Sequence, residues 1–476
     1  MTVRYVSTRG GMAPASFSDV LLGGMAPDGG LVVPDAFPFL TLSELAALED
    51  APYVDVAAAV VQRFADDIPD DQLARLVATT YRPGVFDHPD VVSLTELEPG
   101  LHLAGLSHGP TLAFKDMAMQ LVGQLFEYEL SRKGERLTVL GATSGDTGSS
   151  AEHAMIGKRN VDVFMLSPLG RTSAFQAAQM YSLDEPNIHN IAVRGVFDDC
   201  QDLVKAVNAD ADFKTTHRIG AVNSINWARI VAQSAYYFFS YLGVAGSIGA
   251  PVDIAVPTGN FGNVYAGYVA KRMGLPIRRL VVATNENDVL DEFLSTGRYR
   301  VRSAAEVAAT SSPSMDISKA SNLERYVYAL MGDDPEITRP MFEALGPEAP
   351  VDLSGPDHMQ QIEASGFVSG RSTHADRIAT IRRIHEACGV TVDPHTADGL
   401  FVASALRDAD VPLICLETAQ PAKFAATIEE ALGFAPAPPE RFAGLLDRPQ
   451  RFDVIDADVA QLKAYVAAHA DAPPRP

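Results

Sequence analysis

One lysine of this chain lies where an amine could perform carbonyl chemistry. Lys115 follows a short loop, residues 108–114, and precedes a segment in which Met117 and Leu121 recur at helical spacing. The positive end of a helix dipole disfavours an ammonium, and burial would disfavour it further, so the amine becomes more nucleophilic. The alternative is an ordinary helix lysine in solvent, paired with Asp116. A single lysine leaves both interpretations open.

Two loops rich in glycine and hydroxyl side chains could bind anions. Residues 141–150, GATSGDTGSS, follow an apolar run at 137–140, and residues 257–263, PTGNFGN, follow another at 252–256. Each pattern predicts a strand, a tight loop and a helix start, which together point backbone N–H groups at an anion. Glycine is needed because a Cβ would keep the backbone away from the anion. Such loops suit a nucleotide or sugar phosphate as well as a phosphorylated cofactor, and only the lysine separates these possibilities.

A third polar cluster surrounds the only tryptophan, Trp227. The stretch 221–230, AVNSINWARI, contains Ser224, Asn226 and Arg229 and leads into an aromatic-rich segment. It is either a simple helix start above a core tryptophan or a second anion site. The formal net charge of −22 means that any phosphate site must concentrate positive charge locally.

Composition narrows the class of protein. With 476 residues the chain can bury a large core and should form two or three domains or lobes. The excess of 60 Asp and Glu over 38 Lys and Arg argues against a nucleic-acid partner. Cys200, Cys388 and Cys415 are far apart and lack a metal-like pattern, so we expect free thiols and no metal. No apolar run is long enough to span a membrane and no signal pattern begins the chain, so we expect a cytoplasmic protein without a membrane partner.

Strand and helix patterns alternate from about residue 99, which predicts an α/β fold with parallel sheets flanked by helices. The strand-like runs are 101–106, 137–140, 161–166, 188–193, 252–256, 280–283 and 413–416. Ligands in such folds bind at the carboxyl ends of the strands, where both glycine loops fall. We also expect Thr111 or a neighbour to cap the helix that begins near Lys115.

The same patterns suggest a division of the chain. Residues 1–98, with amphipathic helical spacing over 41–82, predict a helical N-terminal domain. Residues 99–435 would form the catalytic domain, and residues 436–476 a C-terminal segment. Within the catalytic domain we expect a mobile sub-lobe at about 115–220 and a variable insertion at about 295–375.

The lysine and the two loops together resemble the fold-type II pyridoxal-phosphate enzymes, the tryptophan synthase β-like family, and in detail the long-chain threonine synthases. The N-terminal pattern at 5–34, the SPSMDI stretch at 312–317 and the segment 417–424, ETAQPAKF, add to this resemblance. One departure is Gln420, where the family commonly has His. Any proton-transfer role of that His is therefore absent here. His395 we expect to be a satisfied loop histidine rather than a general base.

The resemblance implies a role for each motif. Lys115 would carry pyridoxal 5′-phosphate through its aldehyde, Thr418 would face the pyridine nitrogen, and Asp146 would lie beside the 3-hydroxyl. The cofactor phosphate would be cradled by Gly259, Asn260, Phe261, Gly262 and Asn263. The substrate carboxylate would be bound by Thr143, Ser144 and Thr147. Candidates for the substrate phosphate are Ser224, Asn226 and Arg229, with Lys158 and Lys214 ranked lower.

The implied reaction is the conversion of O-phospho-L-homoserine and water to L-threonine and phosphate, by a monomer or homodimer. A related phospholyase, or a hydroxyamino-acid dehydratase that releases a 2-oxo acid, would share the lysine and the glycine loop. A binding or regulatory protein could keep the fold without turnover, although the intact Lys115 argues against it. A nucleotide-binding dehydrogenase is disfavoured because the GxGxxG fingerprint is missing.

Overall fold

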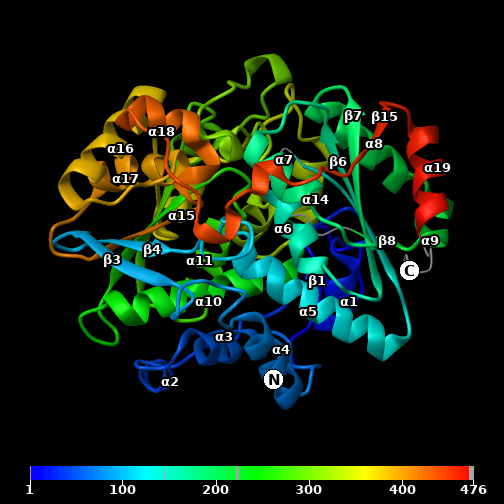
Figure 1. Cartoon of the computed structure of the whole chain (residues 1–476). Coiled ribbons are helices and arrows are strands. Elements are labelled where there is room, and N and C mark those ends of the chain that lie inside the picture. The colour runs from blue at the N-terminus through cyan, green and yellow to red at the C-terminus, as the bar shows by residue number, and fades with distance from the viewer. Residues whose placement is uncertain (1, 144, 221–223, 471–476) are drawn as a thin grey trace.

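A six-stranded sheet forms the core of the larger lobe (Figure 1). The computed structural model describes residues 2–143, 145–220 and 224–470. The strand order is β13-β10-β9-β14-β4-β3, and all neighbours pair parallel except β3, which runs antiparallel to β4. The strands are β3 (Ser93–Glu98), β4 (Leu101–Gly105), β9 (Val252–Pro257), β10 (Ile277–Thr284), β13 (Phe367–Arg371) and β14 (Leu413–Leu416).

Side chains of this sheet alternate between two hydrophobic cores, because successive residues of a strand point to opposite faces. In β9, Ile254 and Val256 belong to the core under helices α10 and α11, whereas Ala255 faces the core formed with α16, α17 and α18. Both faces are therefore apolar and buried, which is why the strands read as continuous apolar runs. These five helices are α10 (Trp227–Val244), α11 (Gly262–Arg272), α16 (His374–Cys388), α17 (Pro394–Leu406) and α18 (Ala425–Leu432).

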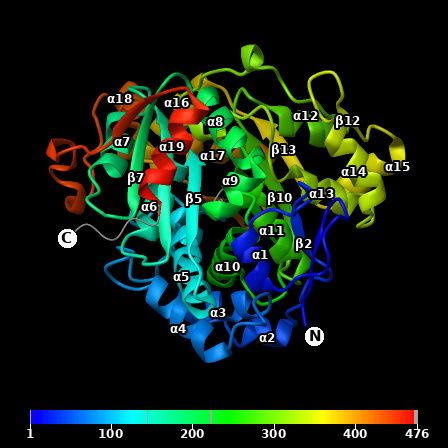
Figure 2. The same ribbon diagram turned by 90° about the vertical axis from the view of Figure 1, so that its right-hand side faces the viewer.

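A five-stranded, fully parallel sheet forms the smaller lobe, in the order β15-β7-β6-β5-β8. Helices α5, α6 and α7 belong to the same lobe, and α8, α9 and α19 lie on its outer side (Figure 2). The strands are β5 (Leu137–Ala142), β6 (Val161–Pro168), β7 (Ile188–Arg194), β8 (Ile219–Gly220) and β15 (Asp453–Asp456). The helices are α5 (Asp116–Lys133), α6 (Asp146–Met155), α7 (Ala174–Tyr181), α8 (Phe197–Ala209), α9 (Ala211–Thr216) and α19 (Val459–His469).

The N-terminal part of the chain packs beneath α5 and α10 (Figure 1). It comprises α1 (Phe17–Gly23), α2 (Leu42–Ala46), α3 (Tyr53–Gln62), α4 (Asp70–Thr80) and the antiparallel pair β1 (Tyr5–Ser7) and β2 (Val32–Pro34). Its apolar residues join the main core of the larger lobe. It therefore supports the two long helices that border the site.

The remaining elements of the larger lobe come between β10 and α16 in the sequence. In space, α14 and α15 lie at the edge of this lobe (Figure 2). They are α12 (Val289–Thr296), α13 (Leu323–Leu330), α14 (Pro335–Ala344), α15 (Pro356–Ala364), β11 (Arg298–Tyr299), β12 (Val351–Asp352), and the 3-10 turns η1 (Ala304–Glu306) and η2 (Pro313–Met315). Three further 3-10 turns follow β14: η3 (Pro421–Phe424), η4 (Glu440–Phe442) and η5 (Leu445–Asp447).

The predicted α/β class with parallel sheets flanked by helices is confirmed. The division of the chain at residues 98 and 435, and the mobility of the smaller lobe, stay predictions. No helix within the described ranges is both long and apolar enough to cross a membrane.

Candidate active site

Lys115 occupies the N-cap position of helix α5, at the end of the loop that follows β4. The loop lies against the segment after β14: Phe114 N donates to Thr418 O over 2.8 Å, and Gln420 N donates to Leu112 O over 3.0 Å. Two strands of the large sheet therefore fix the position of the lysine.

Asp116 ties the lysine loop to helix α6 instead of pairing with Lys115. Its buried carboxylate accepts hydrogen bonds from Thr111 N (2.6 Å), Thr111 Oγ1 (2.7 Å) and Ser150 Oγ (2.6 Å). The alternative of a solvated Lys115–Asp116 pair is therefore wrong. The expected side-chain cap by Thr111 is wrong too, because its hydroxyl is committed to Asp116 and α5 begins without a side-chain cap.

The amine of Lys115 faces a different carboxylate. Its Nζ lies 3.7 Å from Oδ2 of Asp146, and the lysine side chain is 13% exposed. Burial lowers the pKa of Lys115, Asp146 opposes this shift, and the positive charges of Lys423 and Arg229 lower the pKa further. The position thus favours the neutral amine that attack on an aldehyde requires.

Asp146 opens helix α6 at the carboxyl end of β5, as the glycine-loop pattern predicts. Its Oδ1 accepts from Gln176 Nε2 (2.7 Å) and lies 2.9 Å from Lys423 Nζ. Burial alone would raise the pKa of Asp146, but Lys423, Lys115 and Gln176 together hold it well below the usual range. Asp146 is therefore a buried carboxylate that stays ionised.

The second glycine loop lies at the carboxyl end of β9 and opens helix α11. Phe261 takes the left-handed conformation, with φ of 62°, which turns the chain into the helix. A Cβ on Gly259 would lie 3.1 Å from both Met315 Cα and Ser314 O. A larger residue would crowd this close approach of two backbones, and the helix start offers its N–H groups to an anion.

Asn263 is held by two tyrosines of helix α10. Its Oδ1 accepts from Tyr236 OH (2.6 Å) and Tyr237 OH (3.0 Å). Its Nδ2 is buried and has no partner among the described residues. A buried amide donor without a partner is costly, so this atom fits the role of a donor to a bound anion such as the cofactor phosphate. Asn260 is fixed by Ser321, whose hydroxyl donates to Oδ1 over 2.9 Å.

Thr418 follows β14 and lies against a carboxylate that sequence reasoning did not include in the site. Its Oγ1 lies 3.3 Å from Asp393 Oδ2 and 3.3 Å from Thr396 Oγ1. Thr396 donates its own hydroxyl proton to Asp393. Asp393 and Thr396 can therefore only accept a hydrogen bond from the Thr418 hydroxyl. Asp393 fixes the orientation of that hydroxyl.

Thr143 shapes the first glycine loop. Its Oγ1 accepts from Gly145 N and Gly148 N, each over 2.9 Å. Thr147 lies in the first turn of α6 and is partly buried, whereas Ser144 lies outside the described residues. Thr143, which the family resemblance assigned to the substrate carboxylate, thus stabilises the loop through hydrogen bonds within it.

Arg229 is the buried cation of the third cluster. It lies in the first turn of α10, is 4% exposed, and burial lowers its pKa to about 10, so it remains charged at neutral pH. Asn226 caps this helix through Ala228 N (3.0 Å) and donates to Leu21 O (3.0 Å), so it positions the helix start. The carbonyl of Ser224 lies close to Gly262 of the second glycine loop.

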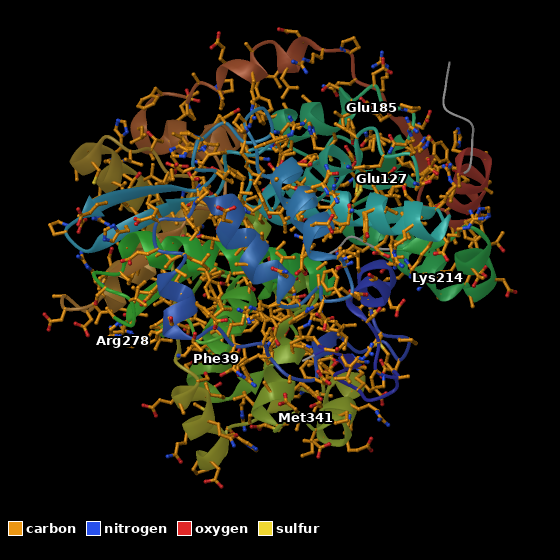
Figure 3. The ribbon with its side chains drawn as sticks, turned by 90° about the horizontal axis from the view of Figure 1, so that it is seen from below. Phe39, Glu127, Glu185, Lys214, Arg278 and Met341 are labelled. Atoms are coloured by element: carbon orange, nitrogen blue, oxygen red, sulfur yellow. The ribbon has the colours of Figure 1, made fainter. Side chains whose placement is uncertain are left out.

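The two lower-ranked lysines lie elsewhere. Lys214 is exposed on helix α9, at the periphery of the molecule (Figure 3). Lys158 follows helix α6 and is partly buried, with Glu127 as the charged group that acts on it. In the part of the chain that the structure describes, no three His, Cys, Asp or Glu side chains gather so as to hold a metal ion.

Comparison with known proteins places this geometry in a family. The profile of the pyridoxal-phosphate dependent enzymes matches residues 95–339, and profiles of the threonine synthase N terminus and C-terminal region match 4–81 and 396–466. Threonine synthase of Methylobacillus glycogenes is 53% identical over 474 residues, which cover 98% of this chain and 100% of the relative. Threonine synthase of Corynebacterium glutamicum is also 53% identical, over 97% of this chain and 98% of the relative. This chain belongs to the threonine synthase family.

Solved structures of threonine synthases have the same fold. PLP-bound threonine synthase from Brucella melitensis superposes with a TM-score of 0.94 at 42% identity, over 99% of this chain and 100% of that one. The yeast enzyme gives 0.91 at 37% identity, over 98% of each chain. The chain is therefore a pyridoxal-phosphate-dependent lyase of threonine biosynthesis, and the predicted family, fold type and cofactor are confirmed.

The position where threonine synthases commonly have His is structural in this chain. Gln420 Nε2 donates to Ser107 Oγ (2.8 Å), and Ser107 Oγ in turn donates to Glu417 Oε2 (2.5 Å). Burial raises the pKa of Glu417 to about 7. Gln420 therefore supports a buried carboxyl next to Thr418.

His395 is satisfied within the protein, as predicted. Its Nδ1 lies 2.8 Å from Asp393 Oδ1, and its Nε2 accepts from Ser314 N over 3.1 Å. Because Nε2 accepts a backbone N–H, the ring is neutral with its proton on Nδ1. Ser314 also places its hydroxyl 3.4 Å from Asp146 Oδ2.

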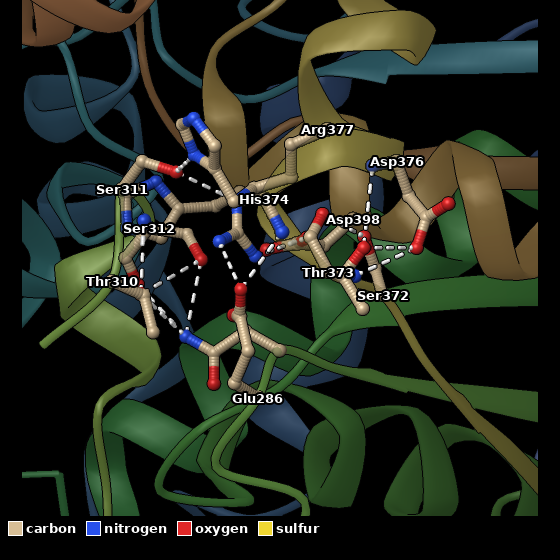
Figure 4. A network of polar contacts seen from close by, with 12 residues as sticks. Glu286, Thr310, Ser311, Ser312, Ser372, Thr373, His374, Asp376, Arg377 and Asp398 are labelled. Atoms are coloured by element: carbon tan, nitrogen blue, oxygen red, sulfur yellow. Dashed lines mark hydrogen bonds and ion pairs between the residues drawn. The ribbon is translucent and has the colours of Figure 1, made fainter. Parts of the chain in front are cut away.

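The SPSMDI stretch is anchored by a buried polar network (Figure 4). Arg377 lies at its centre and donates to Ser311 Oγ (2.8 Å), Glu286 Oε1 (2.8 Å) and Asp398 Oδ1 (3.0 Å). This network holds the segment that carries Ser314 against the active site. Nothing in the local sequence around Arg377 pointed to it, because its partners come from three distant segments.

Proposed function

We propose that this member of the threonine synthase family converts O-phospho-L-homoserine and water to L-threonine and phosphate. The observation that carries the proposal is a buried guanidinium, that of Arg229, in the first turn of the helix whose Tyr236 and Tyr237 hold Asn263 of the second glycine loop. A substrate with a phosphate at the far end from its amino group needs such a second anion site.

The residues present fit pyridoxal 5′-phosphate. Lys115 would bind its aldehyde, Thr418 would face its ring nitrogen and Asp146 would lie beside its 3-hydroxyl. The loop Gly259–Asn263 would bind its phosphate, supported by the unpartnered Nδ2 of Asn263 and by the close packing at Gly259. When bound, the cofactor supplies an electron sink that stabilises negative charge on carbons near the substrate nitrogen.

The remaining polar residues would hold the substrate at its two ends. The first glycine loop, with Thr143, Ser144 and Thr147, would take the carboxylate. Arg229 and Ser224 would take the phosphate, and Asn226 would position them. Because both ends of the substrate are held, the reacting carbons keep a fixed position relative to Lys115.

Lys115 would move the protons. Its amine, kept neutral by its surroundings, would remove the proton from Cα, and the amine or the departing phosphate would remove one from Cβ. The Cγ–O bond then breaks, phosphate leaves with the electron pair, and Cγ gains a proton to become the methyl group. Water adds its oxygen at Cβ as the hydroxyl of threonine, and Lys115 returns a proton to Cα.

Closure of the smaller lobe would exclude water until the last step. Asp146, Gln176 and Lys115 lie at the junction of the two lobes, so a shift of the smaller lobe would change the site directly. Hydrogen exchange of residues 115–220 should slow when a substrate analogue binds, and unchanged exchange would contradict closure. The proposed enzyme acts as a monomer or a homodimer.

The test is to identify the products by ³¹P and ¹H NMR after cofactor-loaded protein is mixed with O-phospho-L-homoserine. Threonine and phosphate would support the proposal. 2-Oxobutyrate and phosphate would instead make the protein a phospholyase that uses the same Lys115. If neither product forms while the cofactor is bound, the assignment of the substrate phosphate to Arg229 is wrong.

A further inference from the structure

A second buried lysine lies beside Lys115. Lys423 belongs to η3, and its side chain is completely buried. Its Nζ donates to Thr111 O (2.6 Å) and to Gln179 Oε1 (3.0 Å), and lies 2.9 Å from Asp146 Oδ1. We propose that Lys423 is a positioning residue, which holds the Asp146 carboxylate by Oδ1 and thereby keeps Oδ2 at 3.7 Å from Lys115 Nζ.

The contacts of Lys423 leave it no role as a base. An ammonium has three protons, and the three acceptors around Nζ use all of them. A buried cation of this kind is tolerated only when it is paired and fully hydrogen-bonded. Lys423 is therefore a fixed positive charge, and its effect on the chemistry must pass through Asp146 or through space.

The Asp146 carboxylate is therefore held through one of its two oxygens. Gln176 Nε2 and Lys423 Nζ bind Oδ1, so the other oxygen is the one that faces Lys115 Nζ at 3.7 Å and Ser314 Oγ at 3.4 Å. Rotation of the carboxylate would break two charge-assisted contacts at once. The carboxylate thus presents one defined oxygen to the reacting amine.

Lys423 also joins the two lobes at the site. It follows β14 of the larger lobe, whereas Asp146 and Gln179 belong to α6 and α7 of the smaller lobe. Its contact with Thr111 O adds the lysine loop to the same junction. A single ammonium therefore links the lysine loop, α6 and α7 beside Lys115.

Charged groups on four elements, α10, η3, α6 and α5, act on one another around Lys115. Arg229 acts on Lys115 from α10 and lowers the pKa of its amine, as does Lys423 from η3, while Asp146 from α6 raises it. His153 of α6 lies 3.1 Å from the carbonyl of Gln179; burial lowers its pKa, the contact with Gln179 and the charge of Asp116 raise it, and the charges of Lys423 and Arg441 lower it. Without Lys423, the Asp146 carboxylate would lose its nearer ion-pair partner and keep only Lys115, so it should approach Lys115 more closely and raise the pKa of that amine.

The inference rests on the proposed role of Lys115 and is tested first without cofactor. Competitive acetylation of the apoenzyme, with mass spectrometry of the Lys115 peptide, gives the reactivity of this amine as a function of pH. In Lys423→Met the profile should move to higher pH, with at least about a threefold slower reaction at pH 8. Lys423→Arg should retain most of the wild-type profile. The control Lys205→Met removes a lysine from an exposed ion pair and should react like the wild type.

A double variant separates positioning from a direct charge effect. If Lys423 acts by holding Asp146, then Lys423→Met should change the reactivity of Lys115 in the Asp146→Asn background by less than about half as much as in the wild type. An equal change in both backgrounds would overturn the positioning role. Near-ultraviolet circular dichroism checks that each variant is folded, and Lys423→Gln, which keeps a donor to Thr111 O, replaces Lys423→Met if that variant does not fold.

The holoenzyme supplies the second readout. The midpoint of the pH-dependent change in visible absorbance of the bound cofactor should move to higher pH in Lys423→Met and stay in place in Lys205→Met. Borohydride reduction and peptide mapping then locate the cofactor. Cofactor on another lysine would refute the proposed function, whereas cofactor on Lys115 with wild-type profiles in every Lys423 variant would refute this inference alone.

Discussion

The hydroxyl of Tyr236 donates to Oδ1 of Asn263 over 2.6 Å and so ties helix α10 to the first turn of helix α11. Tyr237 makes the same contact from the next residue of α10. The two tyrosines use up the acceptor of the amide and leave its donor, Nδ2, for a bound anion. The helix that carries Arg229 thus also shapes the proposed site of the cofactor phosphate.

Asn263→Asp should therefore weaken cofactor binding strongly. The tyrosines still have an acceptor, but the donor becomes a second negative charge against the phosphate. We expect the dissociation constant of pyridoxal 5′-phosphate to rise at least about 100-fold, since one buried charge contact is typically worth 2–3 kcal/mol or more. Tyr236→Phe, which leaves Tyr237 in place, should raise it by less than about tenfold. Cofactor fluorescence titration measures both, and equal affinity in Asn263→Asp and the wild type would contradict the assignment.

Arg229→Ala should raise the KM for O-phospho-L-homoserine about 10- to 100-fold, because a charge-assisted contact to phosphate is typically worth 1.5–3 kcal/mol. Arg229→Lys keeps the charge and loses the forked geometry, so it should fall between Ala and the wild type. Steady-state phosphate release gives KM, and cofactor titration of the same samples shows whether the effect is confined to the substrate. Unchanged KM in Arg229→Ala would remove this residue from the substrate site.

Glu417→Gln should abolish a pH-dependent loss of stability. Burial raises the pKa of Glu417 from its ordinary value of 4.5 to about 7. A carboxyl whose pKa is higher in the folded protein stabilises the fold below pH 4.5, and this contribution is lost as the pH rises through about 7. Over this range the wild type should lose about 3 kcal/mol relative to the variant, which cannot ionise. Urea unfolding at pH 5 and pH 8 gives the difference, and parallel pH dependence in both proteins would disprove it.

Arg377→Met should destabilise the protein by about 3–5 kcal/mol, because the Asp398 carboxyl would remain buried without its partner. Asp398 already has a pKa raised to about 6 by burial, even though Arg377 opposes the shift. The double variant Arg377→Met/Asp398→Leu removes both charges and should recover part of the loss. Urea unfolding of the single and double variants provides the test; equal stability in the two would mean that the pair is not coupled.

Sequence reasoning found the elements that have strong local signals. The apolar runs 137–140 and 252–256 correspond to β5 and β9, because strands buried on both faces read as unbroken apolar stretches. Strand β15 was not predicted. Its four residues, DVID, are mostly exposed and are a strand only because they pair with β7.

The same distinction applies to the site. Lys115 and the two glycine loops were predicted because each lies at a strand-to-helix transition that the local pattern reveals. Lys423 and Asp393 were missed as site residues, since their importance depends on distant partners. Asp116 was paired with the wrong residue for a related reason: its neighbour in sequence is Lys115, but its contacts in space are Thr111 and Ser150.

The pairing of β15 with β7 bears on how the molecule assembles. The register joins Val454 to Ala192, so one edge of the smaller sheet is completed by residues more than 250 positions further along the chain. During synthesis β7 remains at an open edge while residues 195–452, which include most of the larger lobe, are made, and open edges are templates for association with other chains. Contacts between such distant segments also form slowly, because a long loop must close first. The first glycine loop, which opens α6 and is proposed to bind the substrate carboxylate, belongs to this sheet, so the enzyme should become competent to hold its substrate firmly only late in its own folding.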